Sequence, residues 1–259
     1  IKMLGKEATA VKGNYLSALA MFSAVGITCL SLEIDIKIIL AGVLLGGLIG
    51  SLIAIKVKMT AIPEMVALFN GFGGLATFLI AWSQFNEPSN SMFQHALIML
   101  TIYIGGITFS GSLIAYGKLS EKLKLGKGSM VTNIFISFFY LSMPALIYVV
   151  AEPSLSGLIP QVPSYFAIFL VLTLVAGIGF VMPIGGGDMP VVISLLNSLS
   201  GIAAAFAGLL LLNNVLIVAG SLVGASGLIL TIIMAKAMNR TITNILFVGY
   251  ASVSQASSS

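Results

Sequence analysis

The chain has 259 residues, of which 58% are hydrophobic and only 8% are charged, and its mean hydropathy is +1.12. So few charged side chains cannot cover the surface of a water-soluble domain of this size, which excludes that class. Apolar runs of about 18 residues or more recur along the chain, and each is long enough to cross a bilayer as a helix. The composition therefore predicts an all-α, polytopic transmembrane helix bundle.

The apolar runs predict about eight membrane spans. The last two are separate, because 47 uncharged residues from 189 to 235 would form a helix about 70 Å long. Asn213 and Asn214 are the expected turn between them, since asparagine tolerates tight turns. In chain order the expected spans are residues 14–32, 38–55, 65–85, 93–116, 130–150, 163–182, 189–212 and 215–235.

The cations predict the orientation of these spans. With eight alternating spans, every one of the 12 Lys and Arg residues except Lys37 lies on one side. The positive-inside rule places that side, with both termini, in the cytoplasm or in the mitochondrial matrix. The net charge of +4 is thus explained by loops facing that compartment, and we expect no nucleic-acid partner.

The span 189–212 carries the polar residues that most need explanation. Asp188 is the sole charged residue between Glu152 and Lys236, and orientation places it at the cytoplasmic mouth. Asn197 follows about 13 Å further along the helix, near mid-membrane. Polar groups at such depth are functional-site candidates, although an interhelical hydrogen bond is the alternative for Asn197 and a helix N-cap for Asp188. Helical spacing places on one face Ser194, Asn197, Gly201, Ala204 and Gly208.

The span 65–85 offers a counterpart. Glu64 lies at its cytoplasmic entrance, and Asn70 lies about 9 Å further in. We therefore expect Asn70 and Asn197 to approach one another around a polar or hydrated path. His95, the single histidine, falls in the first turn of the span 93–116, at the opposite membrane face, which favours an interfacial side chain over a proton carrier.

Small residues recur at helical intervals on two spans. Gly42, Gly46 and Gly50 form one ladder, while Gly220 and Gly224, followed by Gly227, form another. Such ladders allow helix backbones to approach closely, so structural contact between helices is the expected role.

Specific strings then resemble the membrane domain of the beta subunit of proton-translocating NAD(P) transhydrogenase. They cover nearly the whole chain in order. The strings are Thr60-Ala-Ile-Pro-Glu-Met-Val-Ala67, Thr108-Phe-Ser-Gly-Ser112 through Gly117-Lys-Leu119, Gly186-Gly-Asp-Met-Pro through Asn197-Ser-Leu-Ser-Gly201, Asn213-Asn-Val-Leu-Ile-Val-Ala-Gly220, Gly224-Ala-Ser-Gly227 and Lys236-Ala-Met-Asn-Arg240.

The resemblance implies an enzyme complex that passes a hydride from NADH to NADP⁺ and couples this transfer to proton movement. This chain would bind no cofactor, because NAD(H) and NADP(H) would be held by other domains. Residues 1–13 would be the end of a preceding helix and a cytoplasmic loop, 14–240 the proton-conducting domain, and 241–259 a linker toward an NADP(H)-binding domain. Expected partners are the alpha subunit with further membrane helices, that NADP(H)-binding domain and a second copy of the assembly, in a bacterial or mitochondrial inner membrane.

The same resemblance implies roles for individual residues. Asn70, Asn197, Ser194 and Glu64 would line the proton path. Asp188 and Arg240 would form a cytoplasmic gate that communicates with the NADP(H) domain, and Gly220, Gly224, Ser226 and Gly227 would pack the last span. One departure matters, because Asn70 stands where some members have a proton-binding histidine. Asparagine does not titrate, so the carrier would be a histidine on an alpha-subunit helix or, second, His95.

Two other classes of protein remain open from the residues alone. A secondary transporter or ion channel would use the same polar stripe and would show broken helices near the midplane, for which Gly71–Gly74 is the candidate. A structural assembly subunit would use the two asparagines as interhelical links.

Overall fold

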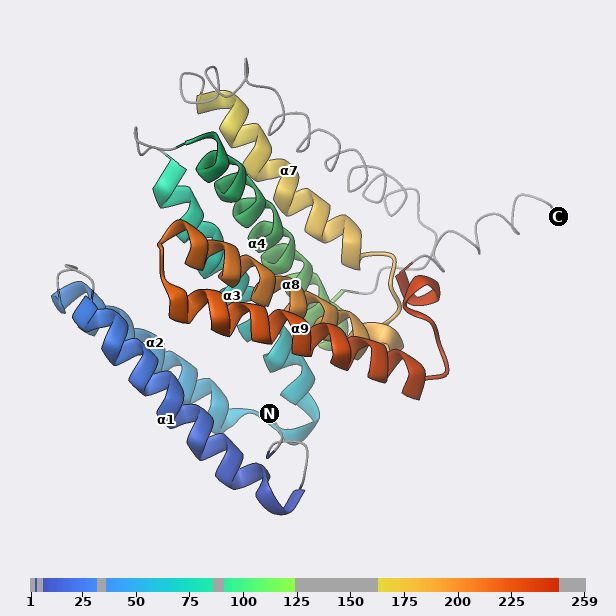
Figure 1. The fold of residues 1–259 in the computed structure, drawn as a ribbon. Helices are drawn as coiled ribbons and strands as arrows, with labels where there is room; N and C mark the ends of the chain where they lie inside the picture. The colour runs from blue at the N-terminus through green and yellow to red at the C-terminus, as the bar shows by residue number, and fades with distance from the viewer. Residues whose placement is uncertain (1–2, 4–6, 32–35, 86–90, 124–162, 247–259) are drawn as a thin grey trace. The chain divides into compact units, whose positions relative to one another are not determined.

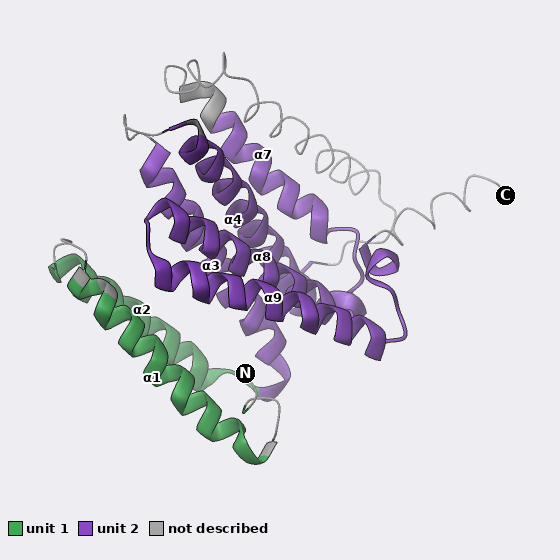
Figure 2. Cartoon of the chain, viewed as in Figure 1, with its two compact units in different colours: residues 1–58 green, residues 59–259 purple. Residues whose placement is uncertain are grey.

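The computed structural model describes residues 3, 7–31, 36–85, 91–123 and 163–246. Within these residues the chain is helical, and Figure 1 shows the helices in chain order. The chain divides into two compact units, residues 1–58 and residues 59–259 (Figure 2), and each is described by itself. The prediction of an all-α bundle is confirmed.

The first unit contains the helices α1 (Glu7–Ser31) and α2 (Ile36–Lys56). No residue of α2 is buried, although the helix is long and apolar enough to span a membrane. Among the described residues nothing lies within 4 Å of a Cβ added at Gly42, Gly46 or Gly50. The expectation that this ladder packs helices together is therefore not met within the described part of this chain.

The second unit is built around α4 (Met92–Leu119), which contacts α3 (Ile62–Phe85), α7 (Pro163–Val181) and α8 (Met189–Leu210). The last helix, α9 (Asn214–Ala237), packs along α8. The apolar window of α4 is 72% buried, against 22% for that of α9. The core of the unit therefore lies along α4, and every helix that contacts it presents a face to that core.

Most expected spans correspond to a helix. Five described helices are long and apolar enough to cross a membrane, and 167–181 is a shorter apolar helix. The helix α1 begins at Glu7, inside the segment expected to be a loop, because nothing in residues 7–13 breaks a helix. The span expected at 130–150 lies outside the described residues.

Two local predictions have definite outcomes. The turn between α8 and α9 lies close to the expected place, but only Asn213 of the expected pair belongs to it. Leu212 adopts a left-handed φ of 51°, the side chain of Asn213 caps α9 by accepting from the N–H of Leu216 at 3.0 Å, and Asn214 is the first residue of α9. The break at Gly71–Gly74 is wrong, because α3 runs unbroken from Ile62 to Phe85. Within this run Gly71 and Gly74 lie close against α4, whereas a Cβ added at Gly73 would meet nothing within 4 Å among the described residues.

Residues 238–246, which follow α9, also pack on the bundle. Asn239 adopts a left-handed φ of 54°, and the N–H of Arg240 donates to the carbonyl of Ala235 at 2.9 Å, which closes a Schellman motif. Residues 242–246 then form a helical turn whose Ile245 is only 3% exposed in the core. The segment expected to be a linker from residue 241 therefore begins with a turn docked on unit 2.

Candidate functional site: a polar cluster and an ion pair joined by one helix

A small polar cluster lies where α3, α4 and α8 meet. The amide nitrogen of Asn70 on α3 donates to the hydroxyl of Ser112 on α4 at 3.0 Å. The amide oxygen of Asn70 accepts from the hydroxyl of Ser200 on α8 at 2.9 Å. One asparagine therefore ties together three helices through both ends of its amide.

The hydroxyl of Ser200 has two acceptors in reach. Besides the Asn70 oxygen, the backbone carbonyl of Asn197 lies 2.8 Å away. A serine hydroxyl carries a single hydrogen, so it serves one acceptor fully at a time. If the Ser200 hydroxyl donates to the Asn197 carbonyl, the Asn70 oxygen is available to another donor. The contact therefore has two possible hydrogen-bond arrangements.

Asn70 bonds to the helix that carries Asn197, but the two asparagine side chains do not form a hydrogen bond with each other. Asn70 reaches α8 at Ser200, one helical turn from Asn197. The side chain of Asn197 is half-buried and makes no hydrogen bond to any residue that the structure describes. The expected approach is therefore made through Ser200, a residue that the sequence interpretation missed because serine in a helix resembles ordinary small-residue contact.

A buried hydroxyl one turn before Ser112 on α4 has no hydrogen-bond partner among the described residues. Thr108 is fully buried, and its Oγ1 has no hydrogen bond among the described residues. A Cβ added at Gly74 of α3 would lie 2.9 Å from the Thr108 Cβ, so this threonine faces the same α3–α4 contact as Asn70 and Ser112. Buried polar groups are normally satisfied, and an exception calls for a bound water or a functional explanation.

The other residues proposed for the proton path lie elsewhere. Glu64 is half-buried in the first turn of α3 and has no ion pair within the described residues. Ser194 faces α9, where its hydroxyl donates to the carbonyl of Gly227 at 3.2 Å. His95 packs against the ring edge of Phe85 in the first turns of α4, about 25 Å along that helix from Ser112.

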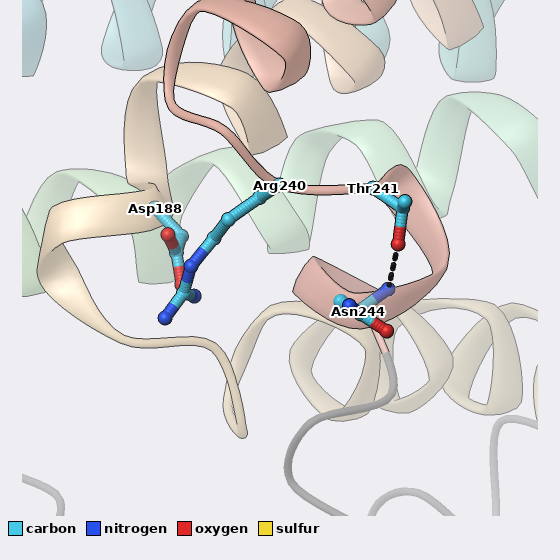
Figure 3. Close-up of polar contacts among 4 residues, drawn as sticks. All are labelled: Asp188, Arg240, Thr241 and Asn244. Atoms are coloured by element: carbon cyan, nitrogen blue, oxygen red, sulfur yellow. Dashed lines mark hydrogen bonds and ion pairs between the residues drawn. The ribbon is translucent and has the colours of Figure 1, made fainter.

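Asp188 and Arg240 form an ion pair at one end of unit 2. The guanidinium Nη1 of Arg240 lies 2.6 Å from Oδ2 of Asp188, and the two side chains extend toward each other from the start of α8 and the end of α9 (Figure 3). The Asp188 side chain is 16% exposed, whereas that of Arg240 is 42% exposed. The pair is therefore partly shielded on the carboxylate side and open to solvent on the other.

The predicted N-cap role of Asp188 is met in position but not by a side-chain hydrogen bond. Asp188 occupies the N-cap position of α8, but its carboxylate makes no capping hydrogen bond. Its backbone is in the right-handed helical region, continuous with the short 3-10 turn Gly186–Asp188, and its carboxylate pairs with Arg240. Beyond Arg240, the hydroxyl of Thr241 accepts from the N–H of Asn244 at 3.2 Å and fixes the following turn (Figure 3).

Lys118 also lies at this end of unit 2, although the sequence interpretation treated it only as a loop cation. The ammonium of Lys118, near the end of α4, donates to the carbonyls of Val181 at 3.4 Å, Met182, and Ile184 at 2.7 Å. These carbonyls belong to the C-terminus of α7 and to the loop before Asp188. A cavity of about 110 Å³, lined by Lys118, Leu123 and residues 182–186, opens beside it.

The glycines of α9 allow its backbone to approach α8 closely. A Cβ at Gly220 or Gly227 would overlap backbone atoms of α8, and one at Gly224 would lie 3.2 Å from Ile202. The hydroxyl of Ser198 donates to the carbonyl of Gly224 at 2.6 Å. Ser226 differs from these glycines, because among the described residues its hydroxyl bonds only to the carbonyl of Val223 in its own helix.

The arrangement limits the chemistry open to this chain. Asparagine and serine do not titrate near neutral pH, so the cluster at Asn70 can orient a proton carrier or a water chain but cannot hold a proton itself. Among the described residues no group of His, Cys, Asp and Glu side chains is placed to hold a metal ion.

These features define a polytopic α-helical membrane protein with a polar cluster inside the bundle and an ion pair at one end of it. The model of the family described as NAD(P) transhydrogenase beta subunit matches residues 1–259. The chain belongs to this family.

Individual relatives agree with that assignment. Two curated proteins named NAD(P) transhydrogenase subunit beta, both from Rhodospirillum rubrum, are each 37% identical to this chain over 264 residues. The alignment covers 97% of this chain and 55% of each relative. The chain thus spans about half the length of the curated relatives it matches.

Proposed function

We propose that this chain is the proton-translocating membrane part of an NAD(P) transhydrogenase. Proton movement across the membrane would drive hydride transfer from NADH to NADP⁺ in domains outside this chain, which binds neither cofactor. Its partners would be an alpha subunit that adds membrane helices, an NADP(H)-binding domain in the same subunit, and a second copy of the assembly. The complex would lie in a bacterial or mitochondrial inner membrane.

One observation carries the proposal: α8 is bonded at two places to polar groups of different character. Deep in the bundle Ser200 bonds to Asn70, and at the start of the helix Asp188 pairs with Arg240. The two places are 12 residues apart, or about 18 Å of rigid helix. A change in hydrogen bonding at Asn70 therefore has a direct mechanical route to the ion pair.

The proton itself would be carried by a group that approaches Asn70. In this proposal a histidine from an alpha-subunit helix beside α3 exchanges hydrogen bonds with the Asn70 amide, while the half-buried Asn197 amide lines the water-filled part of the path. Release of the Ser200 hydroxyl to its second acceptor frees the Asn70 oxygen for that exchange. His95 is the second choice, and its distance from the cluster along α4 weighs against it.

The ion pair would act as the gate. Arg240 directly precedes the docked turn 242–246, so its pairing with Asp188 sets the exit direction of the chain toward the NADP(H) domain. A partly exposed ion pair is worth only about 1 kcal/mol, which suits a contact that must break and reform in each cycle. Because coupling is thermodynamic, docking of the nucleotide domain must in turn alter proton access at Asn70.

The test uses the complete enzyme in liposomes that contain a pH-sensitive dye. Proton movement and hydride transfer are followed together, with and without an imposed proton gradient. The proposal expects the two rates to rise and fall together and the gradient to accelerate transfer to NADP⁺. Hydride transfer with no proton movement and no response to the gradient would overturn it, and ion or solute flux without nucleotide would favour a channel or transporter.

A further inference from the structure

Lys118 lies at a junction that the proposed path does not yet include. Its ammonium has three N–H donors, and three carbonyl oxygens are within reach of them, those of Val181, Met182 and Ile184. The Val181 carbonyl is at the C-terminus of α7, where unpaired carbonyls and the helix dipole favour a cation, and the other two belong to the loop that follows. Lys118 therefore joins the end of α4 to the loop that leads into α8.

The contacts continue from Lys118 to the ion pair without interruption. The ammonium holds the carbonyl of Ile184, the next residue Gly185 accepts from the N–H of Asp188 at 3.0 Å, and the carboxylate of Asp188 pairs with Arg240. Gly186 and Gly187 have open space where a side chain would be, so they add no contact that holds the loop. The lysine is the charged group that anchors this loop within the described residues.

The same helix also reaches the polar cluster. Ser112, which accepts from Asn70, lies six residues before Lys118, about 9 Å along α4. Asn70 is thus connected to the Asp188 end of unit 2 by two helices, α8 through Ser200 and α4 through Ser112. The end of α4, the α7–α8 loop and the end of α9 lie at the same end of the unit (Figure 1).

We propose that Lys118 is a positioning residue of the gate, which holds the α7–α8 loop so that Asp188 meets Arg240 and which relays movement of α4 to that pair. This inference rests on the proposed function. The positive charge is essential to it, since a neutral side chain leaves carbonyl oxygens at the end of α7 without a cationic donor. The adjacent cavity leaves room for a larger cation, so an arginine at 118 can retain part of the role.

The experiment measures, in the complete enzyme in liposomes, how strongly an imposed proton gradient accelerates hydride transfer. The inference expects Lys118→Met to lower this stimulation about fivefold or more while transfer without a gradient is retained. Lys118→Arg should restore part of it. Lys118→Gln, which keeps N–H donors without the charge, replaces the methionine variant if that variant does not assemble.

Lys122→Met is the matched control. Lys122 carries the same charge just beyond the same end of α4, but it is exposed, and its ammonium bonds among the described residues only to Tyr116, with Nζ 3.2 Å from the hydroxyl and 5.2 Å from the ring centroid. Its substitution should leave gradient stimulation unchanged. An equal loss in both lysine variants would mean that general surface charge is responsible, and would overturn the inference.

A double variant separates this inference from the proposed gate. If Lys118 acts through Asp188, then Lys118→Met added to Asp188→Asn should cause no further loss of stimulation. Losses that multiply, or a Lys118→Met enzyme indistinguishable from the unmodified one, would overturn the role of Lys118 and leave the gate intact. An Asp188→Asn enzyme with normal stimulation would overturn the gate itself, and this inference with it.

Discussion

The side of α8 that faces α9 and the side that faces α3 bond to different kinds of group. Toward α9 the helix presents Gly201 and the hydroxyls of Ser194 and Ser198, which donate to backbone carbonyls of α9 in a close helix contact. Toward α3 it presents Ser200, whose hydroxyl has two competing acceptors. Polar residues on one helix can therefore differ in role, since a hydroxyl with one backbone acceptor in the neighbouring helix fixes geometry and a hydroxyl with two acceptors can change partners.

The largest effect is expected from filling the close contact. In Gly201→Val the new side chain would overlap the backbone of α9 at Gly224, which side-chain rotation cannot relieve. We expect a loss of stability of about 3 kcal/mol or more, measured as thermal unfolding and yield of the assembled complex in detergent. Gly73→Ala is the control, because a Cβ there meets nothing within 4 Å among the described residues. Normal assembly of the valine variant would show that the α8–α9 contact is looser than described.

On the opposite side of α8, Asn70→Leu should impair coupling more than stability. The change removes both interhelical bonds of the amide, while Ser200 keeps its bond to the Asn197 carbonyl. We expect proton movement per hydride transferred to fall about tenfold, at a stability cost of about 1–3 kcal/mol. Thr77→Val serves as control, since the buried Thr77 hydroxyl bonds to Gly74 of its own helix at 2.9 Å. Equal effects of both changes would reduce Asn70 to a structural link.

A smaller effect on coupling, with no loss of stability, is expected for Asn197→Leu. Its amide has no hydrogen bond among the described residues, so leucine removes a half-buried polar group and breaks no hydrogen bond there. Gradient-stimulated transfer should fall about fivefold while the unfolding temperature stays the same or rises. The neighbouring change Ser198→Ala should show the reverse pattern, because it breaks the bond to Gly224. Full proton-coupled activity in the leucine variant would remove Asn197 from the path.

The smallest effect is expected at Ser226. Within the described part of the chain its hydroxyl bonds only inside α9, to the carbonyl of Val223 at 3.1 Å, and the side chain is half-buried. Ser226→Ala should therefore change stability by less than about 0.5 kcal/mol and leave coupling intact, as measured in the same assays. A marked loss of activity would identify a contact of Ser226 with a partner chain and would extend the functional surface to α9.

Hydropathy and charge were enough to predict most of the helices. The turn at Asn213 follows from local residue preferences, and it agrees with the structure. The helix α1 begins at Glu7, before the span expected from residue 14, because that span was bounded by its apolar run and the helix continues beyond the run. The family resemblance implied a linker over residues 241–259, yet Ile245 occupies a buried site.

The site was harder to predict than the spans. Asn70 and Asp188 stood out because amides and charges are rare in or beside apolar segments, whereas Arg240 was identified only from the family resemblance. The structure bonds Asn70 to two helices and pairs Asp188 with Arg240. Ser112, Ser200 and Lys118 did not stand out. Helical serines are common as small contact residues, and a lysine at a helix end is expected for topology alone, so their roles follow only from three-dimensional contacts.

The central claim is that hydrogen bonding at Asn70 controls the Asp188 end of unit 2. Hydrogen exchange of the backbone amides of residues 184–188 tests it most directly, measured in the complete enzyme in lipid nanodiscs with either NADP⁺ or NADPH bound. The account predicts exchange that differs between the two nucleotide states in the unmodified enzyme and that no longer differs in Asn70→Leu. Identical exchange in both states, or a difference that survives the substitution, would contradict it.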